Sequence, residues 1–210
     1  MIKFRTELTL EKNIFEITHK DKILLIGSCF AEEVGRKLLQ HGFNALINPF
    51  GVIFNPFSIA EILHRGVSGD LENLNIIHHK ARFHALDFHG NFQSEDEKSL
   101  LDKIMVHVQQ LYEWIRKTDF LFITWGTAHV YFLRENNKIV ANCHKLPQNL
   151  YGNRRLKIGE ITSCYEKLIR KVLEVNPKIN FIFSVSPVRY FNFGMHENQL
   201  SKATLLLACD

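Results

Sequence analysis

Uninterrupted runs of aliphatic and aromatic residues recur along the chain and predict strands. The clearest are Ile23-Leu24-Leu25-Ile26, the segment 119–126 and the segment 179–185, and 43–47 makes a shorter one. Runs without polar alternation are typical of strands that are buried on both faces, as in a parallel sheet covered by helices.

Between these runs, apolar residues recur with helical spacing. The predicted helices are 31–40, 57–65, a helix that begins at 94–97 and runs to about Lys117, 159–175 and a last helix that begins at Asn198 or Ser201. The segment 94–97 (Ser-Glu-Asp-Glu) has the pattern of a capping box and opens the longest of them. Asn176-Pro177 ends the helix before the last run. Residues 130–133 and 138–142 predict a hairpin, while 66–93 shows little periodicity.

This order predicts an α/β fold, a three-layer α/β/α sandwich with a mainly parallel sheet. We expect one domain over residues 1–210, with an extended lead-in at 1–20 in which Phe4 to Leu10 alternate. The last helix stops in mid-pattern at Cys209-Asp210, so we expect the C-terminal part of the domain to be missing.

Composition narrows the function classes. The net charge is only +4 and the basic residues form no long run, which argues against nucleic-acid binding. We find no signal-peptide pattern and no apolar run of membrane-spanning length. The four cysteines are far apart, as expected for free thiols in the reducing cytoplasm. The oligomeric state cannot be read from the sequence.

Polar residues and glycines follow the predicted strands. Ligands of parallel α/β folds bind beyond the carboxyl ends of the strands, so we expect these stretches to share one crevice. They are Gly27-Ser28-Cys29, Asn48-Pro49-Phe50-Gly51, Gly126-Thr127-Ala128-His129 and Ser186-Pro187-Val188-Arg189.

The stretch after the first strand allows two interpretations. A hydroxyl and a thiol stand where the chain turns from strand to helix, a place that suits a nucleophile of acyl transfer. Alternatively, Ser28 is a helix N-cap and Cys29 a buried thiol. The loop 48–56, with two Asn-Pro pairs around Gly51, is either a rigid pocket wall or a packed surface loop.

Four histidines collect between residues 78 and 89. They lack the spacing and the cysteine partners of a metal site, so we expect no bound metal. Asp87 and His89 can face the same side of an extended segment, which makes this loop a candidate pocket wall. No G-x-G-x-x-G follows the first strand, which disfavours a dinucleotide site, and we expect no cofactor.

The stretch 27–31 (Gly-Ser-Cys-Phe-Ala) spells the motif of the GSCFA family, which groups with the SGNH (GDSL-like) hydrolase superfamily, and the chain resembles this family along nearly its whole length. Further matches are Asn48–Gly51, Gly126–Ala128, Asn142–Lys145, Ser186–Arg189 and Asn198–Ala203. The resemblance implies an SGNH-like (flavodoxin-like) fold.

Carried over residue by residue, the resemblance implies Cys29 as the nucleophile, with Ser28 as the alternative nucleophile or an oxyanion donor. A helix N-terminus favours a thiolate, which supports Cys29. Gly51 matches the superfamily's second block, whose backbone N–H holds the oxyanion. The third block, Gly-x-Asn-Asp, appears only as Gly126-Thr127-Ala128-His129, so Thr127 or Asn142 would replace its Asn.

The superfamily's base is a C-terminal Asp-x-x-His, a pattern that residues 1–210 do not contain. Either it lies beyond Asp210, which we favour, or His196 serves as the base. GSCFA relatives usually place His at 190 and Asp at 193, where this chain has Tyr190 and Phe193. With the first explanation, His196 lines the pocket or is simply a solvated loop residue.

The resemblance therefore implies an acyl-ester hydrolase or acyltransferase that works through a covalent acyl-enzyme, on a small-molecule ester such as an O-acylated carbohydrate. The other candidate pocket residues are Asn48, His89, His129, His144 and Arg189. The alternative is a non-catalytic module that binds a small molecule or carbohydrate and keeps only the fold.

Overall fold

A parallel four-stranded sheet forms the centre of the molecule. The computed structural model describes residues 15–210, so the alternating segment Phe4 to Leu10 lies outside the described residues. The strands are β1 (Lys22–Gly27), β2 (Asn44–Ile47), β6 (Phe120–Trp125) and β10 (Asn180–Val185), in the order β10-β6-β1-β2. All three pairings are parallel, as the apolar runs predict.

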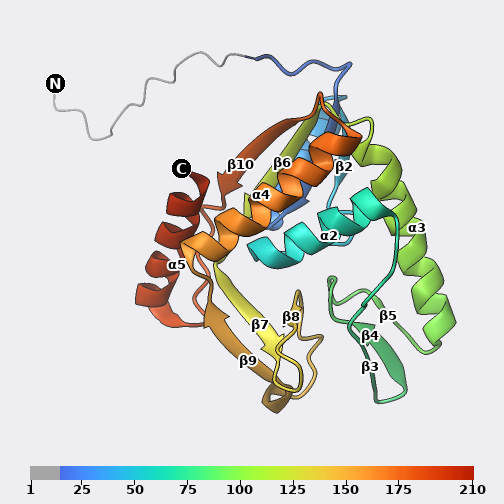
Figure 1. Ribbon diagram of the computed structural model, residues 1–210, viewed down its shortest axis with the longest axis vertical. Coiled ribbons are helices and arrows are strands. Elements are labelled where there is room, and N and C mark those ends of the chain that lie inside the picture. Colours follow the sequence, from blue (N-terminus) through green and yellow to red (C-terminus); the bar gives the residue numbers. More distant parts are fainter. Residues whose placement is uncertain (1–14) are drawn as a thin grey trace.

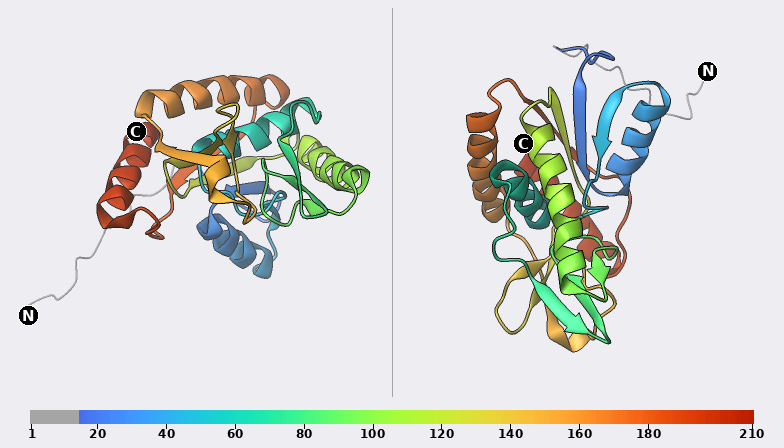
Figure 2. Two further views of the ribbon diagram at one scale, coloured as in Figure 1. Left: turned by 90° about the horizontal axis from the view of Figure 1, so that it is seen from below. Right: turned by 90° about the vertical axis from the view of Figure 1, so that its right-hand side faces the viewer.

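Helices cover both faces of this sheet (Figures 1 and 2). One face carries α1 (Cys29–Gln40), and the other carries α2 (Pro56–Ser68), α3 (Glu97–Ile115) and α4 (Ile158–Val175). The last helix, α5 (Gly194–Cys209), lies beside β10 and contacts α4. The predicted three-layer α/β/α sandwich is confirmed.

Alternate residues of β1 face opposite cores. Leu24 and Ile26 belong to the large cluster that α2, α3 and α4 close, whereas Ile23 and Leu25 pack toward α1. All four are at most 1% exposed, and burial of each such side chain contributes about 1.5–3 kcal/mol. Burial on both faces explains why polar residues do not interrupt this strand.

Two small antiparallel sheets form a lobe beyond the carboxyl edge of the main sheet (Figure 1). Their strands are β3 (Ile76–His79), β4 (Arg82–Ala85) and β5 (Gln93–Ser94), and β7 (His129–Leu133), β8 (Ile139–Val140) and β9 (Tyr151–Arg155), the last preceded by the short helix η1 (Gln148–Leu150). The β7–β8 hairpin is confirmed. The other strands are short and partly exposed, so their apolar pattern did not predict them.

Two predicted helix starts are wrong. Helix α5 begins at Gly194, because Asn198 and Ser201 make tertiary contacts instead: they accept the backbone N–H groups of Tyr190 and Ala128 at 2.8 and 2.7 Å. The N-cap of α3 is Asp96, whose carboxylate accepts the N–H of Ser99 at 2.7 Å, so Ser94 lies outside that helix.

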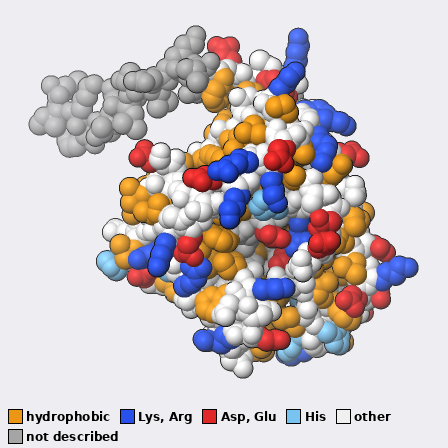
Figure 3. Space-filling view, in the orientation of Figure 1, with side chains coloured by type: hydrophobic (Ala, Val, Ile, Leu, Met, Phe, Trp, Pro, Cys, Tyr) orange, Lys and Arg blue, Asp and Glu red, His pale blue; other side chains and the backbone are white. Residues whose placement is uncertain are grey.

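Acidic and basic side chains are interspersed over the face in Figure 3. Over residues 15–210, we find no helix with the length and apolar character needed to cross a membrane.

Candidate functional site

The strand-to-helix turn after β1 is held by its glycine. Gly27 has φ +138°, and a Cβ there would lie 2.1 Å from the carbonyl oxygen of Thr124 on β6. The Gly27 N–H donates to Asn48 Oδ1 at 2.8 Å, and its carbonyl accepts the N–H of Ile53 at 3.0 Å. Only glycine allows β1 and β6 to approach this closely while the chain turns.

The side chains of Ser28 and Cys29 have different surroundings in the structure. Ser28 is the N-cap of α1 and only 1% exposed, and its hydroxyl accepts the N–H of Phe30 at 3.3 Å. Cys29 is the first residue of the helix and half-buried. Among the described residues, no acceptor binds the Cys29 N–H. The hydroxyl therefore has a structural partner, while the thiol and its own N–H stand at a helix N-terminus.

Cys29 opens into a small cavity of about 30 Å³ at the carboxyl ends of β1, β6 and β10. Its lining consists of Ser28, Cys29, Phe54, Gly126, Thr127, Ser186, Val188, Arg189 and Tyr190. Three of the four predicted strand-end stretches therefore meet. The fourth, Asn48–Gly51, does not line the cavity.

A lysine that sequence reasoning did not select is hydrogen bonded to two residues that line this cavity. Lys202 on α5 donates hydrogen bonds from Nζ to the carbonyl oxygens of Gly126 and Ser186, at 2.5 and 2.7 Å. Burial lowers the pKa of Lys202, and the nearby Cys29 opposes this shift. The segment Asn198–Ala203 matched the family, but only the tertiary structure brings a residue of α5 to Cys29.

The expected oxyanion donors are largely engaged elsewhere. The Gly51 N–H donates to the Asn48 carbonyl at 2.7 Å, and a Cβ at Gly51 would lie 2.4 Å from the Cβ of His89. Thr127 lines the cavity, but its hydroxyl accepts the His129 N–H and hydrogen bonds with Ser201 Oγ, both at 3.1 Å. Asn48, Gly51 and His89 therefore support the turn beside Cys29 without facing it.

The histidines near this site do not line the cavity. His196 is exposed on the first turn of α5. The ring of His129 stacks on Phe193 at 4.4 Å, and its Nε2 lies 3.4 Å from Glu197 Oε2. Burial lowers the pKa of His129, which favours a neutral ring. Arg189, in contrast, lines the cavity.

A larger pocket of about 570 Å³ adjoins this region. Its lining consists of Tyr131, Arg134, Cys143, Gln148, Tyr151, Asn153, Asn192 and Phe193. Tyr190 connects it to the Cys29 cavity: Asn192 Nδ2 donates to the Tyr190 hydroxyl at 2.7 Å, and the Tyr190 and Phe193 rings are 6.0 Å apart. One loop therefore contributes walls to both spaces.

Asn142 and His144 flank Cys143 behind this pocket. The Asn142 side chain accepts the His144 N–H at 2.8 Å, and His144 Nε2 lies 3.3 Å from the Phe88 carbonyl oxygen. Burial lowers the pKa of His144 to about 4 and raises that of Cys143 to about 11. Both groups are thus neutral at physiological pH, and neither lines the Cys29 cavity.

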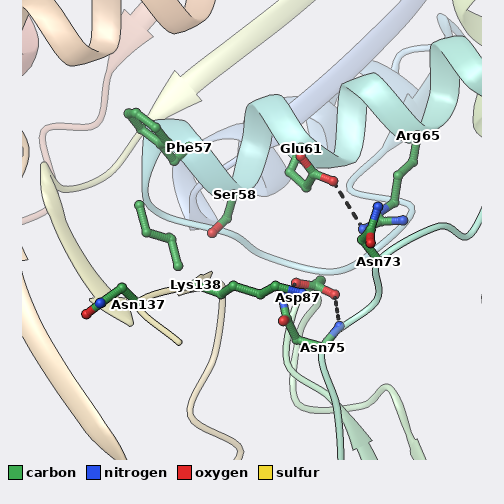
Figure 4. A pocket seen from close by; sticks show the side chains of 10 residues that line it. Phe57, Ser58, Glu61, Arg65, Asn73, Asn75, Asp87, Asn137 and Lys138 are labelled. Atoms are coloured by element: carbon green, nitrogen blue, oxygen red, sulfur yellow. Dashed lines mark hydrogen bonds and ion pairs between the residues drawn. The ribbon is translucent and has the colours of Figure 1, made fainter. Parts of the chain in front are cut away.

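A third pocket, of about 390 Å³, lies between α2 and the lobe (Figure 4). Asp87 is 6% exposed there and accepts two hydrogen bonds from Asn75, from its backbone N–H at 2.7 Å and its side-chain amide at 2.5 Å. Burial raises the pKa of Asp87. The described residues hold no group of three or more histidine, cysteine or acidic side chains that could bind a metal ion.

Comparison with known proteins gives one match. Searches of curated proteins and of solved structures returned no match. The model of the GSCFA family matches residues 22–210, which include every strand of the main sheet and the whole Cys29 cavity. The chain therefore belongs to the GSCFA family.

Proposed function

We propose that this protein is an acyl-ester hydrolase or acyltransferase with Cys29 as its nucleophile. The observation that carries the proposal is the position of the Cys29 thiol, at the N-terminus of α1 and in a cavity where three strand ends meet. A helix N-terminus stabilises a thiolate, and ligands of parallel α/β folds bind at this edge. The engagement of the Ser28 hydroxyl as N-cap favours Cys29 over Ser28.

In the proposed reaction the Cys29 thiolate attacks the carbonyl carbon of an ester. The new S–C bond forms as the carbonyl electron pair moves to oxygen, and the collapse of that oxyanion expels the alkoxide, which takes up a proton. Water or a second alcohol then attacks the thioester carbonyl and gives up its proton, the C–S bond breaks, and Cys29 leaves as the thiolate, which yields a free acid or a new ester. These two outcomes distinguish hydrolase from acyltransferase.

The Cys29 N–H is the main candidate for holding the oxyanion. It has no acceptor among the described residues and belongs to the residue that carries the nucleophile, as oxyanion donors often do. Arg189, which lines the same cavity, is the candidate side-chain donor. Loss of one oxyanion donor typically lowers the catalytic rate about 100- to 1000-fold.

The adjoining pocket supports an O-acylated carbohydrate as the substrate. Three aromatic rings, Tyr131, Tyr151 and Phe193, line it together with amide side chains and Arg134. Aromatic faces pack against the C–H faces of a sugar, while amides and guanidinium groups hydrogen bond its hydroxyls. Tyr190 would then stand between the bound sugar and the acyl group at Cys29.

The test uses p-nitrophenyl acetate and an acetylated oligosaccharide with wild type, Cys29→Ala and Ser28→Ala. We expect Cys29→Ala to abolish turnover and the covalent acyl adduct in intact-mass spectra. Ser28→Ala should keep the adduct, with a loss of stability of about 1 kcal/mol from the missing cap. Equal acylation of wild type and Cys29→Ala would refute Cys29 as the nucleophile.

A second candidate function is a carbohydrate-binding module without chemistry. The engaged Thr127 hydroxyl and Gly51 N–H favour it, because they leave few free oxyanion donors. A saccharide that raises the melting temperature equally in wild type and Cys29→Ala, with no turnover in either, would support this function.

A further inference from the structure

The amine of Lys202 has one open bonding direction. A side-chain amine has three directions besides its bond to carbon, and two of them point to the carbonyl oxygens of Gly126 and Ser186. Both acceptor residues line the cavity that contains Cys29. Among the described residues, Nζ has no third hydrogen-bond acceptor. Cys29 is near enough to Lys202 to influence its pKa electrostatically.

We propose that Lys202 is the general base of this site and accepts the proton of the Cys29 thiol. This inference rests on the proposed function. In the step, the S–H bond breaks and leaves its electron pair on Sγ, while the lone pair of Nζ forms a new N–H bond. The products are a thiolate and an ammonium group, and the ammonium later returns its proton to the departing alkoxide.

The two carbonyl groups suit both protonation states of Lys202. A neutral amine has two N–H groups for the carbonyls and one lone pair for the thiol proton. An ammonium group keeps the same two hydrogen bonds and has a third N–H for the thiolate. Proton transfer therefore keeps both carbonyl hydrogen bonds, which lowers the cost of the step.

The other titratable groups around the cavity are less suited to this role. Burial raises the pKa of Tyr190, which keeps its phenol neutral, and Arg189 remains a cation that cannot accept a proton. His129 is directed to Glu197, and His196 is exposed on α5. Lys202, by contrast, is hydrogen bonded to a residue in each of two walls of the cavity.

The experiment measures iodoacetamide alkylation of Cys29 by peptide mass spectrometry from pH 5 to 10, with ester turnover measured in parallel. Lys202→Gln keeps a hydrogen-bond donor for the carbonyls but has neither charge nor a basic nitrogen. Lys202→Arg keeps the charge and cannot accept a proton at these pH values. Lys98→Gln, an exposed lysine on α3, is the matched control, and thermal unfolding shows that each variant folds.

We expect Lys202→Gln to slow alkylation at pH 7 by about tenfold or more and to move the half-maximal rate to higher pH. Lys202→Arg should alkylate within about threefold of wild type, yet lose ester turnover by about 100-fold or more. Lys98→Gln should match wild type. Should Lys202→Gln and wild type have the same alkylation profile, the inference is overturned.

The two proposals fail in different ways. Turnover that depends on Cys29 but not on Lys202 would overturn the lysine's role and keep the proposed function. Alkylation that depends on Lys202, in a protein that hydrolyses and transfers no ester, would support the Cys29–Lys202 pair and refute the function.

Discussion

Cys29 and Cys143 present the same chemical group in opposite surroundings. Cys29 stands at a helix N-terminus, beside an amine and inside a cavity of about 30 Å³. Cys143 lines a pocket of about 570 Å³, but burial alone accounts for the shift of its pKa to about 11. Within residues 15–210, no cation is among the causes of that shift. The larger space therefore holds a thiol that stays protonated at neutral pH.

In the proposed function, the neighbours of a thiol, rather than the size of the pocket beside it, identify the nucleophile. A large pocket with aromatic rings and amides is suited to binding, whereas a small cavity with a helix N-terminus and an amine is suited to bond making. In this molecule the two are adjacent and share the loop that contains Tyr190 and Asn192. This arrangement fits the proposed function, with one space for binding and the other for reaction.

The largest expected effect comes from replacing Cys29 or Cys143 by alanine, one at a time. Cys29→Ala should lower ester turnover by at least about 1000-fold, whereas Cys143→Ala should keep turnover within about threefold. Steady-state kinetics with the acetylated saccharide checks both variants. A Cys143→Ala enzyme as inactive as Cys29→Ala would remove the distinction between the two thiols.

A substitution at Gly27 should disrupt the turn before Cys29 while the thiol itself remains in the chain. Gly27→Ala should destabilise the fold by about 3–5 kcal/mol, because the added Cβ meets the Thr124 carbonyl and the backbone is held at positive φ. Urea unfolding measures the loss. The control is Gly159→Ala on α4, where nothing lies within 4 Å of the added Cβ; it should change stability by less than about 1 kcal/mol. Equal effects of the two variants would contradict the role given to Gly27.

Acid should lower the stability of the fold through His144, the buried residue that follows Cys143. The folded-state pKa of His144, about 4, lies below the ordinary value of 6.5, so the folded state resists protonation. The stability that this neutral ring contributes is complete above pH 6.5 and is lost as the pH falls toward 4, up to about 3 kcal/mol.

The substitution His144→Asn removes the titrating ring and its pH-dependent contribution to stability. Asparagine also tolerates the left-handed backbone conformation of this position, at φ 48°. The difference in unfolding free energy between wild type and His144→Asn should therefore shrink as the pH falls from 6.5 to 4. Urea titrations at several pH values measure it. A constant difference would show that His144 does not titrate in this window.

The smallest effect concerns the binding pocket itself. The Tyr151 hydroxyl donates to the Cys143 carbonyl at 3.3 Å, so Tyr151→Phe should cost about 0.5–1.5 kcal/mol and leave the alkylation of Cys29 unchanged. If the pocket holds the sugar, KM for the acetylated saccharide rises a few-fold and KM for p-nitrophenyl acetate does not. Equal changes for both esters would contradict a separate sugar pocket.

The sequence predicted the layers of this fold because its strands are buried on both faces. The runs at 23–26 and 119–126 need no polar alternation, and the helices between them have clear apolar stripes. The strands of the lobe were missed, since pairs such as β3 with β4 are short and only partly buried. Their pairing depends on neighbours that are distant along the chain.

The sequence by itself also determined the strand-to-helix turn after β1, since a glycine, a hydroxyl and a thiol follow a buried strand there. Only the tertiary structure shows that the Ser28 hydroxyl accepts the Phe30 N–H, and this contact is a ground for proposing Cys29 rather than Ser28 as the nucleophile. The tertiary structure also brings Lys202, which follows Cys29 by 173 residues in the sequence, close to the cavity. There Lys202 donates hydrogen bonds to two carbonyl groups of lining residues. Local patterns specify caps and turns, whereas the hydrogen bonds from Lys202 on α5 to residues after β6 and β10 depend on how distant segments pack around the sheet.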